Sequence, residues 1–211
     1  MIKLYIAYDS EDVPLGKFFA ECASAVKKGI SSIQDNFSIE EITPASDSTK
    51  VAFFTNTIKH ETYLPFILLA FMHGNENNFI LDQCNFISTK NDNTSLQKTY
   101  IYTNACSSAN ELGPALIQTG AYTFIGPTRD VPMLHKHYDF FSNCHTYPLL
   151  QFLLGVESSF NSFRNRRAYH LDQVNKLRIV DRFAAGILRD QLEIFVCLGE
   201  SKLIADFQVN D

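Results

Sequence analysis

The segment Thr99–Pro127 constrains the fold of this chain more than any other. Its first part, Thr99–Thr103 (TYIYT), is an unbroken run of β-branched and aromatic residues. Such a run is typical of a strand that is buried on both faces of a sheet. Small residues follow at positions 104–109, where they allow the backbone to turn sharply. Cys106 is therefore expected at the carboxyl end of a central strand, where open α/β sheets place their ligands and their chemistry.

The remainder of this segment predicts a helix and a second buried strand. Glu111–Thr119 has Leu112 and Leu116 at helical spacing, and Gly120 is a typical helix C-terminal residue. Ala121–Ile125 (AYTFI) is again apolar and aromatic, and Gly-Pro follows it. A strand, a helix and a strand of this kind form one parallel βαβ unit.

The same reasoning along the chain predicts a doubly wound α/β fold with a mostly parallel central sheet. Residues 1–211 are expected to form a single domain, with a helical insertion before the C-terminal strands. Further strands are predicted at Lys3–Tyr8, Phe37–Ile42 (near an edge), Phe66–Met72, Leu192–Cys197 and Lys202–Phe207. Helices are predicted over Val13–Ser32 (capped by residues 9–12), Thr49–His60, Met133–Phe141, Leu149–Phe163 and Arg164–Arg189, the last with Leu171, Val174, Leu177, Val180 and Ala184 inward. The polar segment Asn77–Lys98 predicts a small hairpin and an exposed loop.

Bulk properties exclude several classes of protein. The chain is 45% hydrophobic with 18 Phe, enough for a large core, and its formal charge of −5 gives no reason to expect nucleic-acid binding. The longest apolar run, Tyr63–Met72, is too short to span a bilayer, so no membrane association is expected. The start of the chain is interpreted as a strand and not as a secretion signal. Five scattered cysteines resemble no disulfide framework, which favours a reducing, cytoplasmic setting.

Two chemically capable residues follow the two most apolar strands. His73 comes directly after Phe66–Met72, and Cys106 comes shortly after Thr99–Thr103. Neighbouring parallel strands lie about 4.8 Å apart, so strand ends in register bring the next side chains close together. A thiol that attacks a carbonyl needs a base nearby, and histidine supplies one with an unperturbed pKa of about 6.5. The backbone N–H groups of Gly74 and Cys106 are candidates to bind a developing oxyanion.

These residues also carry a resemblance to a known family. An apolar strand followed by His73-Gly74, then a strand followed by Ala-Cys-Ser-Ser, a helix and Gly-Ala-Tyr-Thr-Phe-Ile-Gly resembles the caspase-like (clan CD) cysteine peptidases. These include caspases, gingipains and separases, and the chain is most similar to bacterial CHAT-domain proteins. Phe195–Leu203 also looks like the terminal strand-turn-strand of gingipain and CHAT domains.

The resemblance implies a caspase-like fold and a cysteine endopeptidase. His73 and Cys106 would be the catalytic dyad, and Gly74 and Cys106 the oxyanion donors, with a protein or peptide as substrate and no cofactor. Asp130 follows the strand that lines the primary pocket in CHAT-like enzymes, where an acidic residue selects Arg or Lys. Asp9 is a candidate for the same crevice, whereas Arg129 would favour an acidic substrate residue. A peptidase of this kind is also expected to need an activating or regulatory partner.

Other interpretations remain open beside the peptidase. A catalytically inactive, caspase-like interaction module would keep the fold without the chemistry. A nucleotide- or flavin-binding domain lacks support, because no glycine-rich phosphate loop follows the first strand at Tyr8–Glu11. His135, His137, Cys144 and His145 lack a defensible metal-ligand spacing and are interpreted as helix surface. The basic residues between Arg164 and Arg189 alternate with acidic ones, which favours an ordinary solvated helix face over a partner surface.

Overall fold

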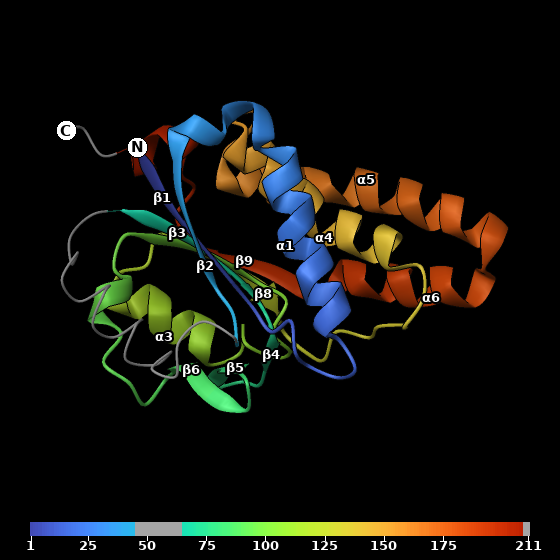
Figure 1. Cartoon of the computed structure of the whole chain (residues 1–211), viewed down its shortest axis with the longest axis horizontal. Coiled ribbons are helices and arrows are strands. Elements are labelled where there is room, and N and C mark those ends of the chain that lie inside the picture. The colour runs from blue at the N-terminus through green and yellow to red at the C-terminus, as the bar shows by residue number, and fades with distance from the viewer. Residues whose placement is uncertain (45–64, 209–211) are drawn as a thin grey trace.

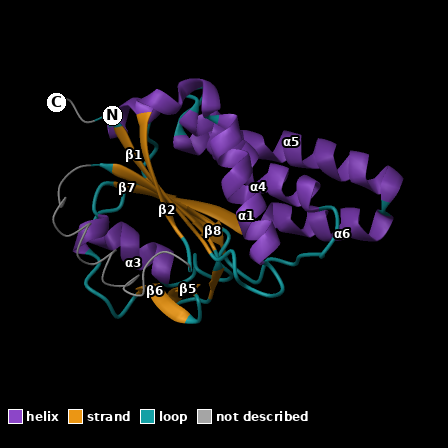
Figure 2. Cartoon of the chain, viewed as in Figure 1, coloured by secondary structure: helices purple, strands orange, loops and turns teal. Residues whose placement is uncertain are grey.

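The computed structural model describes residues 1–44 and 65–208, which form an α/β fold around a six-stranded, mostly parallel mixed sheet. Helices cover both faces of this sheet, and a small antiparallel sheet lies beside it (Figures 1 and 2). The helix predicted over Thr49–His60 lies outside the described residues. Within the described ranges, no helix combines the length and the apolar character needed to cross a membrane.

The central sheet has the strand order β2-β1-β3-β7-β8-β9. The strands are β1 (Ile2–Tyr8), β2 (Phe37–Ile42), β3 (Phe66–Phe71), β7 (Thr99–Thr103), β8 (Thr123–Pro127) and β9 (Phe195–Gly199). The first five in this order pair in parallel, and β9 pairs antiparallel to β8. Every residue of β3 and β7 is buried, as their unbroken apolar sequences predict, and β2 lies at the edge.

Alternate side chains of the central strands point to opposite faces of the sheet and pack in two separate cores. Leu4 and Ile6 of β1 face the core that contains α1 (Gly16–Gly29), α4 (Tyr138–Leu153), α5 (Ser159–Val180) and α6 (Arg182–Asp190). Tyr5 and Ala7 face the core formed with α3 (Leu112–Thr119) and the small sheet. Short 3-10 helices occur at η1 (Ser31–Asn36), η2 (Thr94–Leu96), η3 (Gln191–Glu193) and η4 (Ile204–Phe207). This period-two alternation is the reason that both faces of the sheet must be covered.

The small sheet consists of β4 (His73–Gly74), β5 (Asn78–Leu81) and β6 (Cys84–Ser88). The predicted hairpin is confirmed, because Asp82 and Gln83 form its two-residue turn with φ angles of 51° and 60°. The sequence did not predict that β5 also pairs antiparallel with His73–Gly74. This pairing ties the residues directly after β3 to the hairpin and so determines where they lie.

The helical insertion lies between β8 and β9, but its boundaries differ from the prediction. The helices expected at Met133–Phe141 and Leu149–Phe163 are wrong, because one helix, α4, passes through Pro148 and ends before Gly155, whose φ is +70°. Proline removes one backbone hydrogen bond from a helix interior. Here Pro148 is buried, and burial of an apolar helix face outweighs that loss.

The charged helical run expected over Arg164–Arg189 is two helices. Asp181 ends α5 and caps α6, because its Oδ1 accepts a hydrogen bond from the Ala184 N–H at 3.0 Å. Leu171 and Val180, predicted to face inward, are instead exposed, while Val174, Leu177 and Ala184 are buried as predicted. The break at Asp181 changes the direction of the chain, so a single helical stripe cannot extend across it.

The last predicted strand, Lys202–Phe207, is also wrong. Its backbone N–H groups bond to side chains: the Lys202 N–H donates to Ser159 Oγ of α5 at 2.9 Å, and the Leu203 N–H donates to Asp206 Oδ2 within the same segment at 2.9 Å. These side-chain acceptors satisfy donors that a sheet ladder would otherwise use. The described C-terminal part therefore contributes one strand, β9, followed by the 3-10 helix η4.

Candidate active site

The strands that precede His73 and Cys106 are direct neighbours in the sheet. In the β3–β7 pair, Ala70 lies opposite Thr103, the last paired residues of the two strands, and His73 and Cys106 each follow three residues later. Both side chains line one small pocket of about 20 Å³. The adjacency expected from the two apolar strands is thus present, with both residues beyond the carboxyl ends of parallel strands.

Polar side chains fasten the two strand ends where the sheet hydrogen bonding stops. Thr103 Oγ1 donates to the Ala70 carbonyl at 2.9 Å and accepts from the Ala105 N–H at 2.9 Å. Asn104 Oδ1 accepts from the Met72 N–H at 3.2 Å. These bonds connect the residues just before His73 with those just before Cys106, so the two candidate groups have a common support.

Cys106 is half-buried, and its sulfur accepts a hydrogen bond from the Val131 N–H at 3.4 Å. Burial raises the pKa of the Cys106 thiol, the Val131 N–H lowers it, and the nearby Asp130 carboxylate raises it, with burial the largest effect. Burial and Asp130 therefore favour the neutral thiol over the thiolate. Because the thiolate is the nucleophile, attack on a carbonyl requires a base beside it.

The ring of His73 is held by two contacts. Its Nε2 lies 3.0 Å from Asp12 Oδ2, and its ring meets Phe19 edge-on at a centroid distance of 5.5 Å. Asp12 is itself fixed, because its Oδ1 accepts from the Leu15 N–H at 2.7 Å where α1 begins. Asp12 thus contacts one of the two ring nitrogens of His73 and holds the orientation of the ring.

Asp12 is a functional candidate that the sequence reasoning missed. It was expected only as part of the capping segment 9–12, and its bond to Leu15 agrees with that role. Its second oxygen, however, contacts a histidine 61 positions further along the chain. No local pattern predicts such a contact. The only available signal is that Asp12 lies in the acidic segment just after the first strand, at the same edge of the sheet as His73.

Gly74 allows the His73 segment to approach the Cys106 segment closely. A Cβ at position 74 would lie 2.6 Å from the Ala105 Cβ and 2.9 Å from the Asn78 carbonyl oxygen. The Cys106 N–H makes no hydrogen bond to another of the described residues. The predicted role of the Cys106 and Gly74 N–H groups as oxyanion donors stays a prediction, and the absence of a side chain at Gly74 is what permits the close approach to Ala105.

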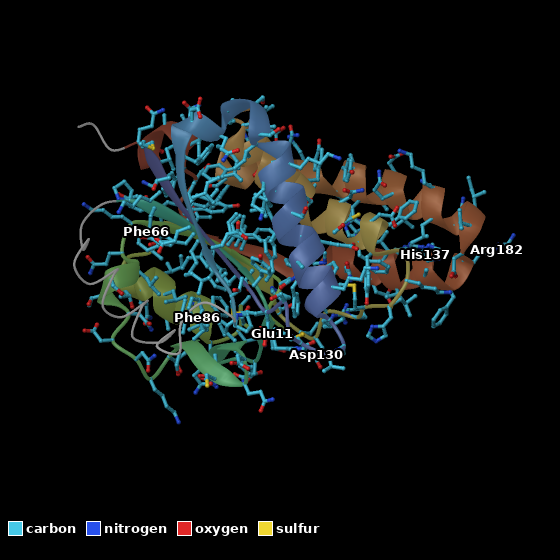
Figure 3. All side chains as sticks on the ribbon, in the orientation of Figure 1. Glu11, Phe66, Phe86, Asp130, His137 and Arg182 are labelled. Carbon is cyan, nitrogen blue, oxygen red and sulfur yellow. The ribbon has the colours of Figure 1, made fainter. Side chains whose placement is uncertain are left out.

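An open crevice of about 650 Å³ adjoins His73 and Gly74 on the side of β1. Its charged lining is acidic throughout, with Asp9, Glu11, Asp12 and Asp82 and no Lys or Arg among the described lining residues. Asp9, predicted to face a substrate crevice, does line this one; it is buried, and its Oδ2 accepts from the Asp82 N–H at 3.0 Å. Figure 3 shows Glu11 at this end of the molecule, where α1 begins, whereas Phe66 lies near the other end of the sheet.

Asp130 and Arg129 lie on the Cys106 side of the site and do not line the acidic crevice with Asp9. Both are exposed. Asp130 Oδ1 accepts from Ser107 Oγ at 3.4 Å, and the Arg129 carbonyl accepts from the Ser107 N–H at 3.3 Å. The structure therefore does not bring the two predicted acidic residues to one crevice, although Asp130 remains close enough to affect the Cys106 thiol.

The four residues considered as metal ligands have different surroundings. His135 Nδ1 contacts the Tyr138 hydroxyl at 3.1 Å, and His137 Nε2 lies 3.4 Å from Asp181 Oδ2. Cys144 and His145 are buried, not on the helix surface as expected. Across residues 1–44 and 65–208, no group of three or more His, Cys, Asp or Glu side chains is placed to hold a metal ion.

Comparison with protein-family models, curated proteins and solved structures gave no match. The case for a function therefore depends on the residues and geometry described above.

Proposed function

We propose that this chain is a cysteine endopeptidase of caspase-like fold, in which Cys106 is the nucleophile and His73 the general acid-base. One observation carries the proposal: two adjacent parallel strands end in a thiol and an imidazole that line the same pocket. The strand order and the helices on both faces are consistent with the caspase-like fold implied by the sequence. A single domain in the cytoplasm remains the expected context.

The geometry suits acyl transfer through a thioester. His73 takes the proton of the Cys106 thiol on Nδ1, because Nε2 faces Asp12. The thiolate attacks the peptide carbonyl carbon, and the Cys106 and Gly74 N–H groups bind the oxyanion. His73 then gives its proton to the leaving amine, and water hydrolyses the thioester. Asp12 is a positioning residue in this scheme, since it orients the ring and stabilises the imidazolium.

The acidic crevice supports a preference for a basic substrate residue. Asp9, Glu11, Asp12 and Asp82 surround a space that is large enough for an Arg or Lys side chain. Two unit charges 4 Å apart attract by about 4 kcal/mol at an effective dielectric constant of 20. Asp130 adds negative charge near the nucleophile. An acidic substrate residue that paired with Arg129 would be repelled by this neighbouring carboxylate.

The resting state of Cys106 agrees with an enzyme that needs an activating or regulatory partner. Burial keeps the thiol neutral, and the pocket that it shares with His73 has room for about one water molecule. A partner that opened this pocket would expose the sulfur to water and so favour its thiolate form. The identity of such a partner does not follow from the fold.

The test uses the full chain and an arginyl chloromethyl ketone of two or three residues. Wild type is expected to be alkylated at Cys106, as read by peptide mapping, and to cleave a fluorogenic peptide with Arg before the scissile bond. Cys106→Ala and His73→Ala should each abolish cleavage, while Cys84→Ala, at an exposed cysteine that lines neither the pocket nor the crevice, should not. Cleavage that persists in Cys106→Ala would refute the proposal.

A second candidate function is an inactive interaction module that binds a basic peptide in the acidic crevice. The raised pKa of the Cys106 thiol favours it, because a neutral, half-buried thiol is a poor nucleophile. Binding of an Arg-rich peptide that is equal in wild type and in Cys106→Ala, with no cleavage by either, would identify this function.

A further inference from the structure

Asn104 has a buried side-chain NH2 group that makes no hydrogen bond to the described part of the chain. The residue is 4% exposed, and its Nδ2 makes no hydrogen bond within the described residues. Its orientation is determined by its other side-chain atom, because the Met72 N–H needs an acceptor and Oδ1 supplies it at 3.2 Å. The two N–H donors of Nδ2 are therefore the ones that remain unsatisfied.

An unpaired buried donor of this kind needs an explanation. More than about 90% of buried polar groups in proteins have a partner, and leaving a donor unpaired costs roughly 1–3 kcal/mol. The position beside the candidate nucleophile suggests that the missing acceptor arrives with a ligand.

Asn104 lines the same pocket as His73 and Cys106. The other lining residues are apolar or flank the nucleophile: Leu15, Phe18, Phe19, Met72, Val131 and Met133. At about 20 Å³, the pocket has space for one oxygen atom or one water molecule and no larger group. The chemistry that fits is a single acceptor oxygen next to the sulfur.

We propose that the Asn104 amide donates a hydrogen bond to the carbonyl oxygen of the substrate group that Cys106 attacks. This inference rests on the proposed peptidase function and adds a side-chain donor to the backbone N–H groups of Cys106 and Gly74. Asn104 would then be a catalytic residue, since it touches the reacting oxygen. A side-chain amide can supply such stabilisation because it is preorganised and shielded from water.

A peptidyl aldehyde reports this bond directly. The Cys106 thiolate adds to the aldehyde carbon, so a C–S bond forms and the π pair of the C=O moves to oxygen. That oxygen accepts the hydrogen bond from Asn104 Nδ2 and then takes a proton from the His73 imidazolium, which yields a neutral hemithioacetal. Iodoacetamide alkylates the same sulfur with loss of iodide and develops no charge on a carbonyl oxygen, so it reports the reactivity of the thiol alone.

The experiment measures, for the full chain, the dissociation constant of a peptidyl argininal and the rate of Cys106 alkylation by iodoacetamide. Asn104→Asp keeps an oxygen acceptor for the Met72 N–H and removes the amide donor, while Asn104→Leu removes both. We expect both variants to bind the argininal about 100-fold more weakly after correction for their alkylation rates. Thr103→Val is the matched control, because it breaks strand-end hydrogen bonds that support His73 and Cys106 without touching a free donor, and any loss of that support appears in the alkylation rate used for the correction.

The outcomes separate the two proposals. Loss of aldehyde binding in both Asn104 variants, with Thr103→Val close to wild type, supports the amide as an oxyanion donor. Loss of aldehyde binding in Asn104→Leu alone would show that Asn104 acts only through the Met72 N–H. Wild-type binding in both variants would show that water satisfies Nδ2. Either result overturns the inference and leaves the peptidase proposal intact. If the wild-type protein forms no hemithioacetal at Cys106, the peptidase proposal itself fails.

Discussion

The close approach of Gly74 to Ala105 gives the sharpest prediction about the architecture of the site. In Gly74→Ala, the new Cβ would start 2.6 Å from the Ala105 Cβ and 2.9 Å from the Asn78 carbonyl oxygen. Carbon atoms in contact normally lie about 3.5–4.0 Å apart, so the two segments must separate by roughly 1 Å. Both neighbours are held, Ala105 by Thr103 and Asn78 by the hairpin, so neither can yield cheaply.

Overpacking of this kind costs about 1–3 kcal/mol of unfolding free energy. For a chain of this length each kcal/mol corresponds to roughly 2–4 °C in Tm. Urea unfolding and a thermal melt followed by circular dichroism measure both values. We also expect the rate of Cys106 alkylation to change, because the displaced segment carries His73.

Gly186→Ala is the matched control for this prediction. Gly186 lies in α6, and a Cβ there meets nothing within 4 Å. The same substitution should therefore stabilise the protein, by up to about 1 kcal/mol, through helix propensity alone. Equal stability of Gly74→Ala and Gly186→Ala would refute the close approach on which the site geometry depends.

Three further predictions concern the core, the pH dependence and the site. Phe152→Ala should lower the unfolding free energy by about 3–5 kcal/mol in urea titrations, because Phe152 is fully buried and stacks on Tyr100 at 4.4 Å between ring centroids. Burial lowers the pKa of His145 to about 3 and of His170 to about 4, so below the unfolded-state pKa of about 6.5 the unfolded chain binds protons that the folded chain does not. The free energy of unfolding should fall as the pH drops from about 6.5 to 4, by at most about 1.4 kcal/mol per pH unit for each histidine. Urea midpoints at several pH values measure this, and a His145→Gln variant whose midpoints fall as steeply as those of wild type would show that His145 is not the cause. Asp12→Asn should slow alkylation of Cys106 by iodoacetamide, a reagent that does not occupy the crevice, at least about 10-fold in a timed mass-spectrometric assay, whereas Glu11→Gln, which lines the crevice without contacting His73, should change it much less.

Local sequence patterns were sufficient for most of the sheet. The unbroken apolar runs of β3 and β7 predict strands buried on both faces, and every residue of both strands is buried in the structure. Gly120, with φ of +110°, ends α3 as its position in the sequence predicts. Local patterns failed between β8 and η4. Pro148 suggests the end of a helix, yet α4 continues through it, and the run around Asp181 suggests one continuous helix, yet α6 begins there. Packing against the sheet decides both.

What the sequence by itself determined is which strands are buried on both faces and which chemistry follows them: His73 comes after one apolar run and Cys106 after another. That information is local, because burial and turn formation depend on side chains a few positions apart. Only the tertiary structure decided that β3 and β7 pair with Ala70 opposite Thr103, that Asp12 reaches His73, and that a buried Asn104 amide is left without a partner beside them. Each of these depends on contacts between segments that are distant in sequence, and the energies that select such contacts arise only when the whole sheet packs.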